Sequence, residues 1–116
     1  MSDDETVDLA VQRTHLEAGS ERLQARIERL QAEIDDEDWA QPKPDEADQG
    51  AAAVERERLR SLAAQAREAL EQTRAALTRI DLGTYGKCTR CGAQIGAGRL
   101  EARPEAELCV TCQQRR

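Results

Sequence analysis

The chain has 116 residues, enough for one ordinary domain with an extension. One Trp, one Tyr and no Phe leave too little aromatic area for a thick globular core, while 34% of the residues are charged. A net charge of −6 is unsuited to neutralising duplex phosphates, so sequence-specific DNA binding is not expected.

The charge is unevenly distributed. Residues 1–50 carry 15 acidic and 5 basic side chains, whereas residues 51–116 carry 8 acidic and 12 basic ones. This asymmetry indicates that the two ends of the chain meet different environments. No apolar run approaches the roughly 20 residues needed to cross a bilayer, and the first residues lack the pattern of a secretion signal. A cytoplasmic protein with no membrane partner is therefore expected.

A first helix is predicted for about residues 6–37. Apolar residues recur with the alternating three-and-four spacing of a coiled-coil seam, at Leu9, Leu16, Leu23, Ile27, Leu30 and Ile34. Gly19 interrupts this helix at a cost of about 1 kcal/mol relative to Ala, but the repeat keeps its register.

Pro42 and Pro44 break the helical pattern, so a turn is predicted within residues 35–50. A second helix follows at about 47–81, with a narrow seam of Leu59, Leu62, Ala66, Ala69, Thr73, Ala76, Leu77 and Ile80. We therefore expect a mainly α fold, in which residues 1–81 form a long antiparallel coiled-coil hairpin with an acidic tip near 35–50. Disorder is the competing interpretation of so polar a chain.

Residues 82–116 are rich in Gly and predict a small C4 zinc-finger module. Two C-x-x-C pairs, separated by 17 residues, supply Cys88, Cys91, Cys109 and Cys112. Zn²⁺ prefers a tetrahedron of four thiolates, which leaves no open position for catalysis, so one structural zinc ion is predicted. A redox dithiol and two disulfides are the competing interpretations. Tyr85 is expected to pack where the second helix meets the finger.

The finger residues carry a family resemblance. Two consecutive segments of the chain resemble the C4 zinc finger of the DksA/TraR family. They are Tyr85-Gly-x-Cys-x-x-Cys-Gly-x-x-Ile-Gly and Arg99-Leu-Glu-Ala-Arg-Pro-x-Ala-x-Leu-Cys-x-x-Cys112. The resemblance implies a bacterial transcription regulator without enzymatic activity. It further implies that the hairpin enters the secondary channel of RNA polymerase and that aspartates at its tip modulate initiation.

The family's tip motif is D-x-x-D-x-A, and two segments match it. Asp45, Asp48 and Gly50 stand at the family's distance before the first cysteine, with Gly in place of the usual Ala. The alternative match is Asp35, Asp38 and Ala40, which lies before the two prolines. Asp45 or Asp48 also suits the simpler role of capping the second helix.

The resemblance also places Arg99 and Arg103 at basic positions near the binding site for the alarmone ppGpp. Gln72 and Gln113 stand where alarmone-responsive members tend to carry Lys. Because phosphate groups require cationic donors, weak or absent ppGpp dependence is predicted.

Two other functions fit parts of the pattern. A zinc-ribbon and coiled-coil adaptor would bind a protein other than RNA polymerase through the same hairpin. A DNA-binding finger has only the basic balance of residues 86–116 in its favour. An enzyme is not expected, because no nucleophile–base pair or phosphate-binding glycine loop is recognisable.

Overall fold

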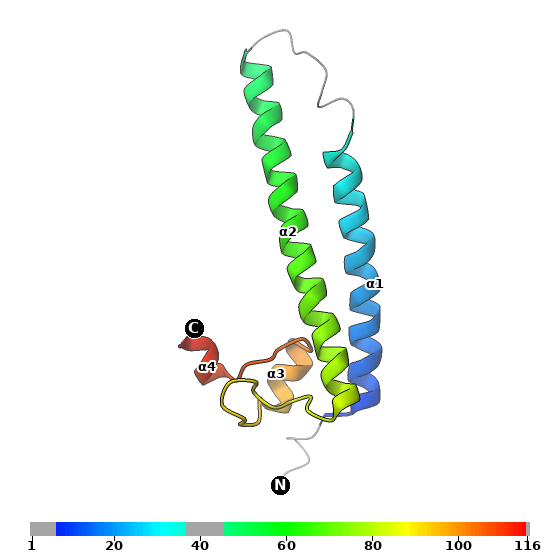
Figure 1. Ribbon diagram of the computed structural model, residues 1–116, viewed down its shortest axis with the longest axis vertical. Coiled ribbons are helices and arrows are strands. Elements are labelled where there is room, and N and C mark those ends of the chain that lie inside the picture. Colours follow the sequence, from blue (N-terminus) through cyan, green and yellow to red (C-terminus); the bar gives the residue numbers. More distant parts are fainter. Residues whose placement is uncertain (1–6, 37–45, 116) are drawn as a thin grey trace. The chain divides into compact units, whose positions relative to one another are not determined.

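The computed structural model describes residues 7–36 and 46–115, with side chains in the second range described from residue 50 onward. The elements in chain order are α1 (Leu9–Ile34), α2 (Glu46–Leu82), α3 (Ala97–Ala102) and α4 (Val110–Gln114) (Figure 1). The described residues hold no strand, only an isolated antiparallel bridge between Lys87 and Gln94. The mainly α fold with two long helices is thus confirmed. None of the described helices is long and apolar enough to cross a bilayer.

The helix ends have identifiable local causes. Asp8 accepts hydrogen bonds from the backbone N–H groups of Ala10 (3.0 Å) and Val11 (3.3 Å), and so satisfies donors at the start of α1. After α2, Gly83 adopts a φ of 79° and its N–H donates to the Ile80 carbonyl at 3.2 Å. A glycine in the left-handed region is a common helix stop because it carries no Cβ.

The chain divides into two compact units. The first, here called the finger unit, joins the chain up to Ser20 to Glu71–Arg116; the second, the hairpin unit, is Glu21–Leu70. Each unit contains part of α1 and part of α2. The two units are described separately below.

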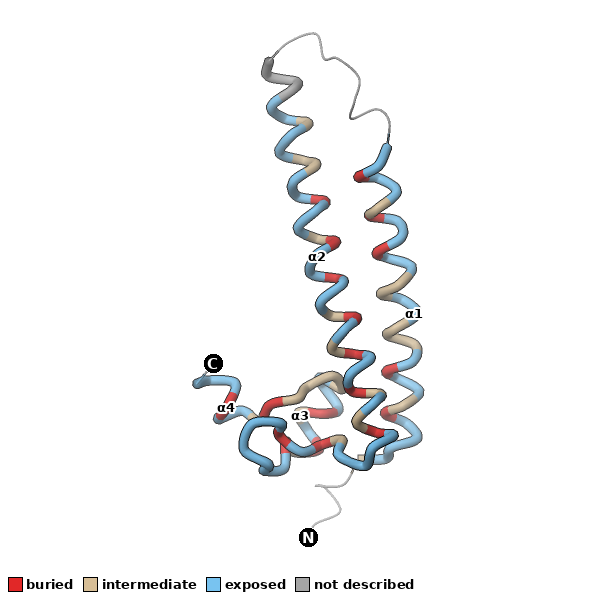
Figure 2. Tube along the Cα trace, in the orientation of Figure 1, coloured by how far each residue is buried: buried red, intermediate tan, exposed pale blue. Residues whose placement is uncertain are grey.

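In the hairpin unit, α1 and α2 pack along a narrow apolar seam. Two clusters of side chains form it: Leu30, Ile34, Leu59 and Ala63 with Leu62, and Ile27, Ala66 and Leu70 with Leu23. Later residues of α1 meet earlier residues of α2, so the helices run antiparallel. Figure 2 shows the buried positions following one side of each helix, with exposed positions on the other sides.

In the finger unit, the start of α1 packs against the end of α2. Leu16, Ala76 and Ile80 form the buried cluster, and Leu77 and Tyr85 pack against it. The alternation of three and four residues predicted this seam well, because both helices bury one narrow stripe.

The seam differs from the prediction at its end. Leu9 was predicted to lie in the seam, but its exposed fraction is 48%, so that prediction is wrong. Leu9 is the first residue of α1, and the buried position in the next turn is occupied by Gln12, which is 3% exposed. Ala63 and Leu70, which the predicted seam omitted, are also buried.

Candidate metal centre

The first cysteine pair lies on a tight turn closed by backbone hydrogen bonds. The Cys88 N–H donates to the Ala93 carbonyl at 2.8 Å, and the Gly92 N–H donates back to the Cys88 carbonyl at 2.9 Å. Gly92 adopts a φ of 79°, which L side chains rarely allow. Gly92 therefore lets the backbone fold back toward the sulfurs.

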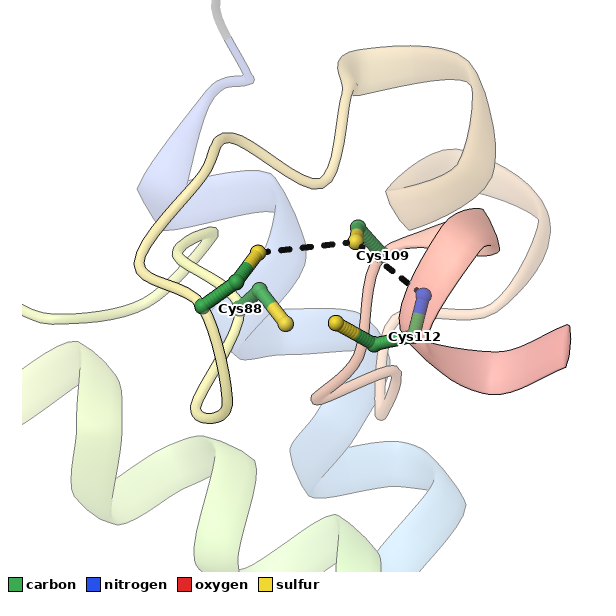
Figure 3. A group of neighbouring side chains, drawn as sticks. Cys88, Cys109 and Cys112 are labelled. Carbon is green, nitrogen blue, oxygen red and sulfur yellow. Dashed lines mark hydrogen bonds between the residues drawn. The ribbon is translucent and has the colours of Figure 1, made fainter. Parts of the chain in front are cut away.

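The second cysteine pair lies at the start of α4. Cys109 is the N-cap residue, and its Sγ accepts a hydrogen bond from the Cys112 N–H at 3.5 Å. The helical turn places Cys112 beside Cys109 on the same side of the chain. Figure 3 shows the side chains of Cys88, Cys109 and Cys112 pointing toward one another from two different segments.

The four sulfur atoms form one cluster. They lie within 4.8 Å of one another, and the Cys91 and Cys109 sulfurs are 3.8 Å apart. A tetrahedron with Zn–S bonds of about 2.3 Å has edges of about 3.8 Å, so this spacing suits four thiolates around one zinc ion. A disulfide requires a sulfur–sulfur distance of about 2.05 Å, and all four cysteines are free thiols. The geometry favours metal binding over the predicted alternative of two disulfides.

Burial and charge are unequal among the four thiols. Cys88 and Cys112 are buried, whereas Cys91 is exposed. Hydrogen bonding from the Cys109 backbone lowers the pKa of the Cys88 thiol to about 6, and burial raises the pKa of the Cys112 thiol to about 12. A bound Zn²⁺ ion lowers the pKa of the thiols that ligate it, so Cys112 could bind as a thiolate despite its burial.

A small apolar cluster surrounds the two buried cysteines. Ile95, Leu100 and Leu108 pack with Cys88 and Cys112, and Val7, Tyr85, Ala106 and Cys109 lie against them. The finger places few apolar side chains in contact with one another, which is too small a core to fold a segment of this length without a further constraint. A closed four-thiolate zinc site supplies that constraint.

Arg99 and Arg103 line one shallow pocket of about 90 Å³. The other residues lining it are Gln72, Glu105, Ala106, Glu107 and Gln113. Arg99 donates from Nε to the Leu108 carbonyl at 3.1 Å, and Arg103 Nε lies 3.5 Å from a carboxylate oxygen of Glu105. The structure thus brings together the residues that the resemblance linked to ppGpp, but two glutamates lie among them.

The predicted tip residues are only partly described. Asp35 follows α1, is exposed, and accepts a hydrogen bond from Gln31 Nε2 at 3.0 Å. Asp48 and Gly50 belong to the first turns of α2, and Gly50 is exposed. Asp38, Ala40, Asp45 and the side chain of Asp48 lie outside the described residues.

A buried polar network was not foreseen from the sequence. Gln12 donates both N–H bonds of its amide, to the Tyr85 hydroxyl at 3.0 Å and to the Leu100 carbonyl at 2.9 Å. The Tyr85 hydroxyl donates to the Pro104 carbonyl at 2.8 Å, and burial raises the pKa of this hydroxyl. Tyr85 packs against both the α1–α2 cluster and the finger cluster, at the predicted junction. Gln12 does not belong to the predicted seam, so no signal in the sequence indicated this network.

Some comparisons with known proteins match only the cysteine-containing end of the chain. Residues 83–116 match the family model of the prokaryotic dksA/traR C4-type zinc finger. The RNA polymerase-binding transcription factor DksA of Haemophilus influenzae is 44% identical over 46 residues, which span 40% of this chain and 32% of that relative.

Other relatives match along most of the chain. The RNA polymerase-binding transcription factor DksA of Escherichia coli K12 is 32% identical over 111 residues, or 90% of this chain and 68% of that protein. The structure of transcription factor DksA2 from Pseudomonas aeruginosa is similar with a TM-score of 0.77 and 34% identity, over 92% of this chain and 81% of that one. The chain has two long helices and a cluster of four cysteines that fits one structural zinc ion, as the family model and these relatives lead one to expect. The chain therefore belongs to the DksA/TraR family of C4-type zinc-finger proteins.

Proposed function

We propose that this chain is a non-enzymatic transcription regulator that binds bacterial RNA polymerase through the enzyme's secondary channel. The observation that carries the proposal is the similarity, over 90% of the chain, to a relative named for binding RNA polymerase. We place the protein in the cytoplasm because bacterial RNA polymerase works there. All four cysteines ligate the zinc ion in this proposal, and the ion has a structural role.

The acidic tip is the proposed effector of this regulator. Residues 35–48 hold seven carboxylates against the single basic Lys43, and α2 is 37 residues long, roughly 55 Å at 1.5 Å per residue. A negative group at the end of a narrow hairpin is attracted to a channel lined with basic groups and metal ions. Asp45 and Asp48 are the proposed functional pair, and Asp35 with Asp38 is the alternative.

Binding to the polymerase is tested first. Tagged protein should capture purified core RNA polymerase, and a second factor known to occupy the secondary channel should displace it. A protein that captures no polymerase would favour the adaptor function instead. Salt-dependent binding to duplex DNA in the absence of polymerase would favour the DNA-binding finger.

The tip is tested by removing charge while keeping helix capping. Asn caps helices about as well as Asp, so the double variant Asp45→Asn, Asp48→Asn should fold and bind polymerase but lose its effect on a sensitive promoter in vitro. Asp35→Asn with Asp38→Asn tests the alternative pair. Glu68→Gln with Glu71→Gln is a control that removes two charges from exposed positions of α2 and should regulate like the parent. Unchanged regulation by the Asp45, Asp48 variant would exclude that pair.

We further propose weak or absent dependence on ppGpp. The negative charges of Glu105 and Glu107 offset the positive charges of the two arginines in the shallow pocket. Gln72 and Gln113 add no positive charge. Transcription in vitro should therefore respond alike with and without ppGpp, whereas Gln72→Lys with Gln113→Lys should increase any response. Strong synergy in the parent protein would contradict this proposal.

A further inference from the structure

The amide of Gln12 is buried in the finger unit, although it belongs to a predominantly polar helix. Its residue is 3% exposed, and its two partners, Tyr85 and Leu100, are 73 and 88 residues away in sequence. A buried amide that loses its partners incurs a desolvation penalty. Gln12 is therefore stable in this position only while the finger presents those two partners.

Both partners depend on the chain between the two cysteine pairs. Leu100 is 3% exposed and packs in the same cluster as Cys88 and Cys112. The carbonyl of Pro104, which fixes the Tyr85 hydroxyl, lies further along the same segment. The Thr89 N–H donates to the Glu107 carbonyl at 2.9 Å, so this segment is also tied to the first cysteine turn. Because the finger has only a small apolar cluster of its own, we expect this segment to take its shape only when the four thiolates are brought together.

Apolar contacts also join the finger to the start of α1. Tyr85 packs against the cluster that contains Leu16, and Val7 packs against the cluster that contains the cysteines. A neighbouring polar contact of α1, the Arg13–Asp81 ion pair with α2 at 2.7 Å, is largely exposed and contributes little to stability. The Gln12 network, formed by Gln12, Tyr85, Leu100 and Pro104, is thus the main polar connection between α1 and the finger among the described residues.

We propose that Gln12 and Tyr85 are positioning residues that couple zinc binding to the folding of the first turns of α1. Zinc holds the finger segment that presents the partners of Gln12, and Gln12 in turn stabilises the zinc-bound form of the finger. Such coupling is reciprocal, so weakening the network lowers zinc affinity and removing zinc releases α1. This inference concerns the chain alone and does not depend on polymerase binding.

Zinc affinity tests one direction of the coupling. The full chain, its Gln12→Met and Tyr85→Phe variants and the double variant compete for zinc with a chromophoric chelator at neutral pH. Each single variant should bind zinc about tenfold more weakly, which corresponds to about 1.4 kcal/mol. The double variant should lose less zinc affinity than the product of the two single-variant losses, because Gln12 and Tyr85 share a hydrogen bond. Gln65→Met, at an exposed position of α2 in the hairpin unit, is the matched control.

Hydrogen exchange tests the other direction. Chelating zinc from the parent protein should remove amide protection from the finger and also from α1 residues 12–20, while residues 23–34 keep theirs. The inference is overturned if residues 12–20 stay protected without zinc. It is equally overturned if Gln12→Met and Tyr85→Phe bind zinc as tightly as Gln65→Met. Should Gln12→Met fail to fold even with zinc, Tyr85→Phe alone decides between these outcomes.

Discussion

Gly92 shows how a single backbone conformation serves the metal centre. It follows Cys91 directly, has a φ of 79°, and has no atom within 4 Å of the place where a Cβ would be added. Any cost of a side chain there arises from the backbone conformation and not from a steric clash. For an L residue, the left-handed conformation costs about 1–2 kcal/mol.

We predict that Gly92→Ala weakens zinc binding roughly tenfold, because the strain of about 1–2 kcal/mol falls on the turn that presents Cys88 and Cys91. Competition with a chelator measures this effect. Gly98→Ala is the matched control: Gly98 lies in α3 without close neighbours, and Ala stabilises a helix by about 0.5–1 kcal/mol relative to Gly. Equal zinc affinities for the two variants would show that the conformation of Gly92 is unimportant.

At the residue scale, the sequence was most informative where function depends on local spacing. The metal-binding role of the C-x-x-C pairs could be predicted because a turn of four residues fixes the geometry of each pair. Gln12 could not be predicted, because its partners lie far away in sequence and only the folded finger brings them near. Its polarity argued against burial until those partners were known.

At the scale of the elements, the small side chains of the seam set how closely α1 and α2 approach. Ala63 is fully buried in a cluster with Leu30, Ile34 and Leu59. A seam of this kind has no space for a larger side chain, since protein interiors are closely packed.

We predict that Ala63→Leu destabilises the hairpin unit by about 1–3 kcal/mol, the usual cost of overpacking a buried site. The midpoint of thermal unfolding, followed by circular dichroism, should fall by roughly 4–12 °C. Ala64→Leu places the same side chain at the neighbouring exposed position and should leave the midpoint nearly unchanged. If both variants unfold at the same temperature, the seam is less tightly packed than described.

Helix boundaries and the seam could be predicted to within a few residues. The predicted helices, 6–37 and 47–81, compare with Leu9–Ile34 and Glu46–Leu82. Prolines and glycines mark the ends, and the alternating three-and-four spacing marks the buried side. The prediction was wrong for Leu9, since a seam at the first turn of a helix depends on which element covers it.

At the scale of the whole molecule, the fold class and the family could be predicted, but the limits of the two compact units could not. The predicted division into residues 1–81 and 82–116 follows chain order and stays a prediction. Contacts instead group the start of α1 and the end of α2 with the finger. An antiparallel hairpin returns its second helix to the start of the first, so the predicted hairpin already implies this grouping. Its limits at Ser20 and Glu71 were not predicted, because the seam keeps its register through both of them.

The grouping has a consequence for how fingers are exchanged between proteins of this kind. A crossover placed at Leu82 would transfer the cysteines but leave Gln12 behind, so the transplanted Tyr85 and Leu100 would face a foreign helix. Crossovers placed inside both helices, near Ser20 and Glu71, would transfer the network intact. The segment that can be inherited or grafted as a piece is therefore discontinuous in sequence, and a chimera has to be joined at two places.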